Sequence, residues 1–333
     1  MPSLWKKFTI PQRRLEDYPL HEKRRGIEKN MERQVQMKGT GFENKKLLHR
    51  LLKWGLKTLK LSEQGLYNVL NLKVVEKTFL LSNFPKKLDG LRILHLSDMH
   101  LDGVPGLLES LQKLLPTLEY DLCVITGDFR FGKRTFSKKE IEPSLELLKS
   151  IDAPLGTYAV LGNHDFIEQV PYFEKAGMRV LLNESLPLDE EENLWLLGVD
   201  DPHLYFCNDL PEAQKNLPED VCKILLVHSP EIVEEAEESG VDLYLCGHTH
   251  GGQIRLPIIG APFSNARCKR KYAFADFNEG EMQGYTHNGT GASSVAARFK
   301  CPSEVVIHTL KRSMVKINHT FYRKCSGKNI FFD

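Results

Sequence analysis

Hydrophobic and polar positions alternate in blocks from about residue 73 onward. Short apolar runs bounded by turn residues predict strands, and the segments between them carry apolar residues at helical spacing. The predicted strands cover 74–81, 91–97, 122–126, 158–161, 194–199, 224–227, 243–246, 254–259, 272–277 and 304–310. The predicted helices cover 106–118, 138–150, 167–177 and 231–239. This alternation predicts an α/β architecture with a mixed sheet system.

The N-terminal part of the chain has a different pattern. Residues 1–43 are polar and basic, which predicts a partly ordered or disordered arm. In residues 44–62, apolar residues cover one side of a helix at about 100° per residue and basic residues cover the other. The apolar side includes Leu48, Leu51, Leu52 and Trp54, and the basic side includes Lys53 and Lys57. Such a helix either lies on a membrane surface or docks on the protein with its basic face in solvent.

These patterns predict two parts, a basic N-terminal arm with an amphipathic helix over residues 1–72 and a globular domain over residues 73–333. The composition is that of an ordinary globular protein, with 333 residues, 41% hydrophobic and 27% charged. The net charge of +1 hides a net of +10 in residues 1–60 and of −9 in the remainder. The basic arm favours an anionic partner, whereas the acidic remainder argues against a nucleic acid.

Cysteine usage and hydropathy bear on the compartment. The seven cysteines are odd in number and form no Cys-x-x-Cys motif, which favours a reducing cytosol over a disulfide framework. No stretch approaches the roughly 18 consecutive apolar residues of a spanning helix, and no signal-peptide pattern follows Met1. We therefore expect a cytoplasmic protein that lies peripherally on the inner face of the cell membrane.

Polar side chains follow five of the predicted strands directly. Ligands of open α/β sheets bind outside the carboxyl ends of the strands, so these side chains are expected to meet at one rim. A glycine precedes three of the groups and lets the backbone turn tightly. The groups are Asp98-Met99-His100, Gly127-Asp128, Gly162-Asn163-His164-Asp165, His228 and Gly247-His248-Thr249-His250.

The side chains in these groups have the chemistry of metal ligands. Apart from His164 and Asp165, these groups offer two carboxylates, an amide and four imidazoles, without a thiolate, which suit manganese, iron, cobalt or zinc better than calcium or magnesium. Seven ligands are too many for one ion, but they fit two ions if one carboxylate bridges. Two metal ions about 3.5–4 Å apart are a recurring device for displacement at phosphorus. The sequence therefore predicts two divalent ions, with manganese as the expected metal and iron, cobalt and zinc as alternatives.

In this order the five groups resemble the calcineurin-like metallophosphoesterases, over about residues 73–312. The resemblance implies a four-layer α/β/β/α sandwich whose site hydrolyses phosphoesters. It implies that one metal is held by Asp98, His100, Asp128 and His250, and the other by the bridging Asp128 with Asn163, His228 and His248. It also implies that His164 faces the phosphate and aids departure of the leaving group, while Asp165 orients the His164 imidazole.

Residues 247–253, Gly-His-Thr-His-Gly-Gly-Gln, are similar to a membrane-associated, phosphodiesterase-like branch of this family. Many members of that branch carry an N-terminal membrane span, and here the cationic amphipathic segment stands in its place. The length, that segment and the Asp98–His100 motif resemble the chlamydial type of UDP-2,3-diacylglucosamine pyrophosphatases. This resemblance implies a nucleotide-diphospho glycolipid as substrate, cleaved to UMP and lipid X in lipid A biosynthesis.

The basic segment after Asp128 contains Arg130, Lys133 and Arg134. Arg130 either clamps the second phosphate of a diphosphate bidentately or lies in a solvated loop. A phosphodiesterase or phosphomonoesterase acting on soluble nucleotides or phospho-metabolites is an alternative with the same metal site. A non-catalytic scaffold is disfavoured, because all seven metal positions and His164 are present.

Overall fold

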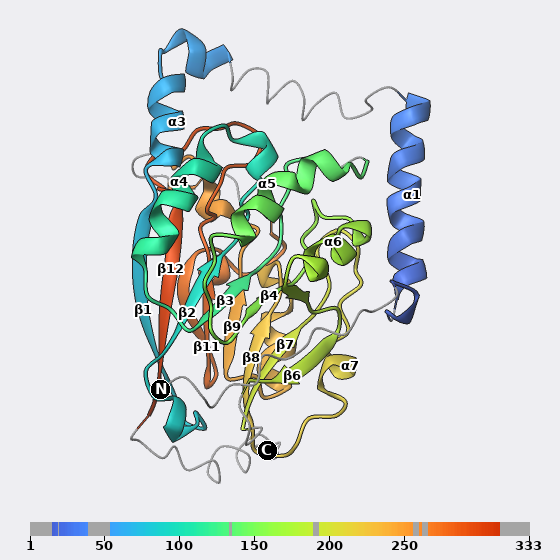
Figure 1. Ribbon diagram of the computed structural model, residues 1–333, viewed down its shortest axis with the longest axis vertical. Coiled ribbons are helices and arrows are strands. Elements are labelled where there is room, and N and C mark those ends of the chain that lie inside the picture. The colour runs from blue at the N-terminus through green and yellow to red at the C-terminus, as the bar shows by residue number, and fades with distance from the viewer. Residues whose placement is uncertain are drawn as a thin grey trace, which may run out of the picture.

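The computed structural model describes residues 15–18, 20–38, 54–132, 135–188, 193–255, 260–261 and 266–313. Its centre is a pair of six-stranded sheets (Figure 1). The strand order is β1-β12-β2-β3-β4-β5 in the first sheet and β10-β11-β9-β8-β7-β6 in the second. Each sheet combines parallel and antiparallel pairs, which confirms the predicted mixed sheet system.

In the first sheet, β12 is inserted between β1 and β2. It runs parallel to β1 and antiparallel to β2, and the remaining pairs of this sheet are parallel. The strands are β1 (Lys73–Leu81), β12 (Glu304–Arg312), β2 (Leu91–Leu96), β3 (Leu122–Ile125), β4 (Thr157–Ala159) and β5 (Met178–Val180).

In the second sheet, the two outer strands, β10 and β6, are antiparallel to their neighbours. The inner pairs are parallel. The strands are β10 (Ala275–Glu279), β11 (Met282–Thr286), β9 (Leu243–Cys246), β8 (Cys222–Leu226), β7 (Leu194–Gly198) and β6 (Glu184–Pro187).

Helices precede the first strand and connect many of the others. The α-helices are α1 (His21–Lys38), α3 (Ser62–Leu70), α4 (Leu107–Leu114), α5 (Lys138–Leu148), α6 (Val170–Lys175), α7 (Leu210–Gln214) and α8 (Val233–Glu238). The 3-10 turns are η1 (Leu15–Asp17), η2 (Lys86–Leu88), η3 (Leu101–Gly103), η4 (Leu115–Thr117), η5 (Ile167–Gln169), η6 (Pro230–Ile232), η7 (His250–Gly252) and η8 (Arg270–Tyr272).

Three hydrophobic layers hold these elements together. In β2, Leu94 and Leu96 pack toward α4 and α5, whereas Ile93 joins the layer between the two sheets, as the two-residue period of a strand requires. In β8, Ile224 lies between the sheets and Leu225 packs toward α7 and α8. Helices therefore cover both outer faces, and the predicted four-layer α/β/β/α sandwich is confirmed (Figure 1).

The structure corrects one predicted strand and adds detail to the predicted arm. The strand predicted over 254–259 is reduced in the described residues to an isolated bridge between Ile254 and Phe299, and residues 256–259 lie outside the described part. Within the predicted arm over 1–43, residues 21–38 form helix α1. Among the described helices, none is long and apolar enough to cross a membrane.

Candidate metal centre

The structure brings the seven predicted ligand side chains to one end of the sandwich. They lie on the segments that follow β2, β3, β4, β8 and β9. Three overlapping groups have ligand atoms within 4.8 Å of one another. These groups are Asp98, His100 and His250; His100, Asp128 and His164; and Asp128, His228 and His248.

The first half of the site is built on Asp98. Its Oδ1 atom lies 3.3 Å from Nε2 of His250. The rings of His250 and His100 are nearly parallel, with their Nε2 atoms 3.2 Å apart. Three potential ligand atoms therefore surround one point.

The second half is built on His228. Its Nε2 atom lies 3.0 Å from Oδ1 of Asn163 and 3.1 Å from Nδ1 of His248. Oδ2 of Asp128 is 3.4 Å from this Nε2 atom and 3.7 Å from Nε2 of His100, in the first half. Asp128 thus stands between the two halves, which is the place that a bridging carboxylate needs.

Backbone carbonyl groups orient two of the imidazoles. Nδ1 of His100 donates to the carbonyl oxygen of Arg130, and Nδ1 of His228 donates to that of Thr126, both at 2.7 Å. In the neutral ring, donation from Nδ1 leaves the lone pair on Nε2, which is the atom that faces the site. Both rings are therefore held as metal ligands are held.

The carboxylate of Asp98 is also oriented to bind a metal ion. Its Oδ2 atom accepts hydrogen bonds from Oγ of Ser97 at 2.6 Å and from the backbone amide of His248 at 2.9 Å. Its Oδ1 atom is buried and accepts no hydrogen bond from the described residues. A buried carboxylate oxygen without a donor is costly, and a cation at this point satisfies it.

The electrostatics of the site favour added positive charge. Burial raises the pKa of Asp98. Despite burial, the imidazoles of His228 and His164 hold the pKa of Asp128 well below its usual range. Burial opposes protonation of His228, yet Asp128 raises the pKa of His228 to about 10. A divalent ion can replace the proton held there, so the residues present fit divalent metal ions.

The backbone is strained at the ligand positions. Left-handed backbone is uncommon for residues other than glycine and costs about 1–3 kcal/mol per residue. It occurs at five of the seven predicted ligands, namely Asp98 (φ 50°), His100 (φ 46°), Asp128 (φ 56°), His248 (φ 72°) and His250 (φ 51°). Such strain persists where the surroundings fix the geometry, which is typical of functional sites.

Two of the preceding glycines are required for different reasons. Gly127 has φ of 86°, so it makes the tight turn that the sequence predicts. Gly247 does not have a positive φ; a Cβ atom there would overlap Oγ of Ser97 and Oδ2 of Asp98. Glycine at 247 therefore allows two ligand-bearing loops to approach closely.

His164 borders the site. Its Nε2 atom is 3.8 Å from Oδ2 of Asp128, and its ring centroid is 4.6 Å from that of His100. Nδ1 of His164 donates to the carbonyl oxygen of Phe131 at 2.7 Å. This hydrogen bond directs the opposite ring nitrogen toward the predicted ligands.

The prediction that Asp165 orients the His164 imidazole is wrong for this structure. The Asp165 carboxylate instead accepts hydrogen bonds from the backbone amides of Asp128 at 2.7 Å, Phe129 at 3.1 Å and Gly162 at 2.8 Å. Burial, followed by the charge of Asp128, raises the pKa of Asp165 to about 6. Asp165 therefore joins the loop after β3 to the loop after β4.

The structure contradicts one of the two roles considered for Arg130. Its side chain is fully buried and pairs with Glu140 of α5, so the segment around it is not a solvated loop. Its Nη2 atom donates to the carbonyl oxygen of Thr135 at 2.6 Å, and its guanidinium lies 4.9 Å from the ring centre of Phe166. The Nε and Nη1 atoms of Arg130 are buried and make no hydrogen bond to the described residues, so the phosphate clamp stays a prediction.

The other predicted contact residues are only partly described. Lys133 and Arg134 lie outside the described residues, as do Leu48, Leu51, Leu52 and Lys53. Residues 54–58 are helical, with Trp54 67% exposed and Lys57 also exposed. Leu59, one turn further, is 69% exposed. In the described part, two side chains of the apolar side, Trp54 and Leu59, are therefore exposed, whereas Leu56 is half-buried.

One residue near the site, His203, is not among the predicted site residues. Its ring centroid lies 4.1 Å from that of His248, and its Nδ1 atom is 2.7 Å from Oε1 of Glu231. Glu231 also accepts a hydrogen bond from the backbone amide of Arg267 at 2.8 Å. The polar run Asp200-Asp201-Pro202-His203 after the strand predicted over 194–199 is the signal that points to it.

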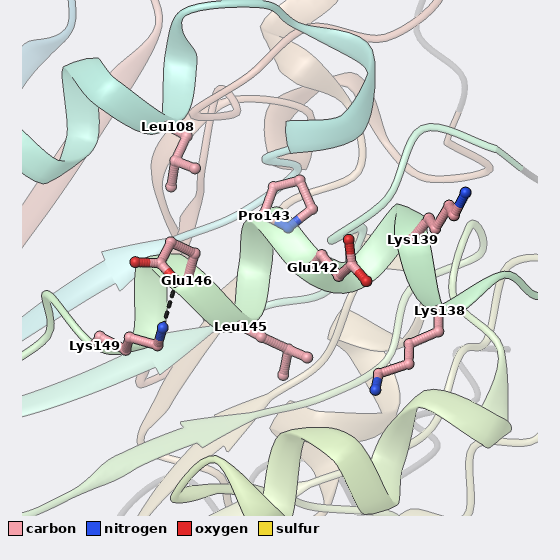
Figure 2. Close-up of a pocket in the computed structure, with 8 residues that line it drawn as sticks. All are labelled: Leu108, Lys138, Lys139, Glu142, Pro143, Leu145, Glu146 and Lys149. Carbon is pink, nitrogen blue, oxygen red and sulfur yellow. Dashed lines mark hydrogen bonds and ion pairs between the residues drawn. The ribbon is translucent and has the colours of Figure 1, made fainter.

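A cavity of about 590 Å³ lies elsewhere on the surface (Figure 2). It is lined by Leu108 and by residues of α5 and its C-terminal end, with Lys138, Lys139 and Lys149 interleaved with Glu142 and Glu146. None of the predicted site residues contributes to its lining. The chemistry is therefore concentrated at the strand ends and not in this cavity.

Comparison with known proteins agrees with this geometry. The calcineurin-like phosphoesterase family model matches residues 91–252, which include all seven predicted ligands and His164. The chain belongs to this family and is a metal-dependent phosphoester hydrolase.

Three bacterial relatives cover most of the chain. The uncharacterized metallophosphoesterase YkuE of Bacillus subtilis is 30% identical, over 72% of this chain and 86% of that protein. An uncharacterized metallophosphoesterase of Aquifex aeolicus is 31% identical, over 72% of this chain and 92% of that protein. The phosphodiesterase YaeI of Escherichia coli is 31% identical, over 65% of this chain and 80% of that protein.

Proposed function

We propose that the seven gathered side chains hold two divalent ions, with manganese as the expected metal. One ion is assigned to Asp98, His100, Asp128 and His250, and the other to Asp128, Asn163, His228 and His248. The observation that carries this assignment is the position of Asp128 Oδ2 between Nε2 of His228 and Nε2 of His100.

The chain's own residues would then divide the work of phosphoester hydrolysis. Bound divalent ions lower the pKa of water toward neutrality and polarise phosphoryl oxygens. Asp98 and Asp128 supply the negative charge that holds such ions. His164, fixed through its Nδ1 atom by the Phe131 carbonyl group, presents its other nitrogen to the phosphate and stabilises charge on the phosphoryl or leaving-group oxygen.

We further propose that the substrate is a lipid with a nucleotide diphosphate head, namely UDP-2,3-diacylglucosamine, cleaved to UMP and lipid X. Support comes from the N-terminal segment, whose described part exposes Trp54 and Leu59 next to Lys57 and Lys60. Exposed apolar side chains beside lysines suit the interface of an anionic membrane. This segment would keep the enzyme on the inner face of the membrane, where the acyl chains of the substrate lie.

The direct test is incubation of the enzyme with manganese and UDP-2,3-diacylglucosamine in oxygen-18 water. Release of UMP supports the proposal, and the position of the label identifies the phosphorus attacked. Label in UMP means attack at the phosphorus that bears uridine, and label in the lipid phosphate means attack at the other. An enzyme that hydrolyses a nitrophenyl phosphodiester but leaves this lipid intact would contradict the substrate assignment while preserving the enzyme class.

Membrane attachment has its own test in the full-length chain. We expect the double variant Trp54→Glu, Leu59→Glu to lose co-sedimentation with vesicles that contain anionic lipid, because both substitutions place charge on the apolar side. Leu80→Glu is the matched control, since Leu80 is also exposed (54%) but lies on β1. Equal co-sedimentation of the wild type and the double variant would refute this role.

A second candidate function is phosphodiester hydrolysis of a soluble substrate. The observation in its favour is that the Escherichia coli relative is named a phosphodiesterase. Under this alternative, activity on a soluble phosphodiester would be independent of vesicles and of the Trp54 and Leu59 substitutions. Stimulation by vesicles in the wild type alone would favour the lipid.

A further inference from the structure

Helix α1 lies outside the segment matched by the family model, yet one of its arginines contacts the loop after β4, which carries His164. Arg24 is fully buried, and its Nη2 atom donates to the carbonyl oxygen of Asp165 at 2.8 Å. Its Nη1 atom pairs with Asp200, and its guanidinium lies 3.9 Å from the ring centre of Tyr205. One α1 side chain thus joins the loop after β4 to the loop after β7.

A second side chain of α1 holds the same loop. Glu28 accepts a hydrogen bond from the backbone amide of Ile167 at 2.9 Å and from Nε of Arg24 at 3.1 Å. Arg25 pairs with Glu168. The segment 165–168, directly after His164, is therefore bound to α1 at three points, two on its backbone and one on the Glu168 side chain.

The loop after β7 is held in a similar way. The hydroxyl group of Tyr18 donates to Oδ2 of Asp200 at 2.5 Å, and Lys23 donates to the carbonyl oxygen of Phe206. This loop carries His203, whose ring contacts that of His248 in a tilted arrangement. Tyr205 closes the arrangement, because its hydroxyl group donates to the same Asp165 carbonyl oxygen at 3.1 Å.

We infer that α1 is part of the catalytic unit, and that Arg24 is a positioning residue which fixes the backbone after His164. The polar character of these contacts argues against a dispensable packing interaction. A buried arginine is tolerated only with its carboxylates in place. Its loss removes the cation that pairs with Asp200 and leaves Glu28 with Arg25 alone, at 3.6 Å. The loops on which His164 and His203 sit then lose a shared support. Groups that orient active-site residues typically change affinity or activity by about 10- to 100-fold when removed.

This inference rests on the proposed role of His164 and not on the proposed lipid substrate. The test therefore uses a soluble nitrophenyl phosphodiester with manganese and compares Arg24→Ala with Arg24→Lys in the full-length chain. We expect Arg24→Ala to lower kcat by about 10- to 100-fold with a smaller change in KM and with both metal ions retained. Added guanidinium ion should restore part of the loss, and Arg24→Lys should be intermediate, since lysine keeps the charge but not the several donors.

Two further measurements separate positioning from a general loss of structure. Hydrogen–deuterium exchange of the amides in 162–168 should increase in Arg24→Ala and in the milder Glu28→Gln, whether or not metal is bound. Arg33→Ala is the matched control, because Arg33 is an exposed arginine of the same helix and should change neither exchange nor kcat.

Several results would show that Arg24 is not a positioning residue. Wild-type kcat in a folded Arg24→Ala protein, or unchanged exchange in 162–168 in both variants, would overturn the inference. An equal loss of activity in Arg24→Ala and Arg33→Ala would also overturn it. The same holds if guanidinium ion does not restore activity to Arg24→Ala and Glu28→Gln does not change the exchange of 162–168. If exchange rises as expected but His164→Ala itself is fully active, the proposed role of His164 fails and the structural link to α1 stands.

Discussion

Within the described residues, two clusters of buried histidines differ in the carboxylates that lie near them. In the metal-site cluster, the imidazoles of His228 and His250 face Asp128 and Asp98 at 3.4 and 3.3 Å. The core histidine cluster consists of His95, His287 and His308, all fully buried between the sheets. There Nδ1 of His95 faces Nε2 of His308 at 3.1 Å, and Nε2 of His95 faces the hydroxyl group of Thr126 at 2.9 Å.

The difference appears in the protonation of His228, whereas burial and the neighbouring His100 lower the pKa of His250 well below its usual range, as in the core cluster. Beside Asp128, and against the effect of burial, the pKa of His228 rises to about 10. In the core cluster, burial lowers the pKa of His95 and His287 well below the usual range and that of His308 to about 3. The imidazoles of the core cluster therefore stay neutral although Glu304 lies 3.9 Å from Nδ1 of His287, and it is the Asp128 carboxylate beside His228 that makes this half of the metal site a place for cations.

The largest effect is expected from Asp128→Asn. This change removes the charge that faces both halves of the metal site while nearly preserving volume. We expect loss of bound metal and a fall in phosphodiester hydrolysis of more than about 100-fold. Plasma emission spectrometry after dialysis and a nitrophenyl phosphodiester assay measure the two effects. Asp276→Asn, at an exposed aspartate, is the control. If Asp128→Asn keeps both metal ions and the wild-type rate, Asp128 is not a metal ligand.

His164→Ala separates binding from catalysis. We expect both metal ions to be retained and turnover to fall by about 100- to 1,000-fold, because His164 borders the ligands and is proposed to act on the phosphate. The same metal measurement and assay apply. Loss of metal in His164→Ala would make this residue a ligand, and an unchanged rate would deny it a catalytic role.

The smallest effect on activity is expected from His308→Gln, which tests the core cluster. Metal content and kcat should stay close to those of the wild type, while the free energy of unfolding falls by about 1–3 kcal/mol through the altered hydrogen bond to His95. Denaturant titration followed by circular dichroism gives this value. A large loss of activity with normal stability would show that the two clusters are coupled.

The low pKa of His308 predicts that the stability of the protein depends on pH. The pKa of His308 is about 3 in the folded protein and about 6.5 in an unfolded chain, so between these values the unfolded state binds the additional proton. His308 therefore contributes stability above pH 6.5 that is lost as the pH falls toward 3. At pH 5 the loss is about 2 kcal/mol relative to pH 7. In His308→Gln the change in unfolding free energy between pH 7 and pH 5 should be smaller by that amount; an identical change would contradict the assignment.

The metal site could be predicted from the sequence because its information is local. Each ligand group, such as Asp98-Met99-His100, follows an apolar strand directly, so strand prediction also places the side chains. The roles of Arg130 and Asp165 could not be predicted in this way. Their partners, Glu140 and the amide of Asp128, are chosen by the packing of separate loops.

Helix α1 was beyond prediction for a related reason. Its sequence is strongly charged, with few apolar positions at helical spacing, and such a pattern usually indicates a solvated segment. Arg24 is nevertheless fully buried because Asp200, 176 positions away in the chain, neutralises it. Long-range ion pairs of this kind leave no periodic signal in the sequence.

The insertion of β12 between β1 and β2 has a consequence for the order in which the protein can assemble. In β12, Glu304 pairs with Lys73 of β1 and Ile307 pairs with Leu94 of β2. Strand β2, which is followed by Asp98, therefore gains this neighbour only after β12 has been synthesised. Contacts between such distant positions form slowly. A nascent chain that has not reached residue 304 would expose the edge of β2, and unpaired edges invite association with other chains. We therefore expect the newly made protein to depend on its final strand for protection from aggregation, before any metal is bound.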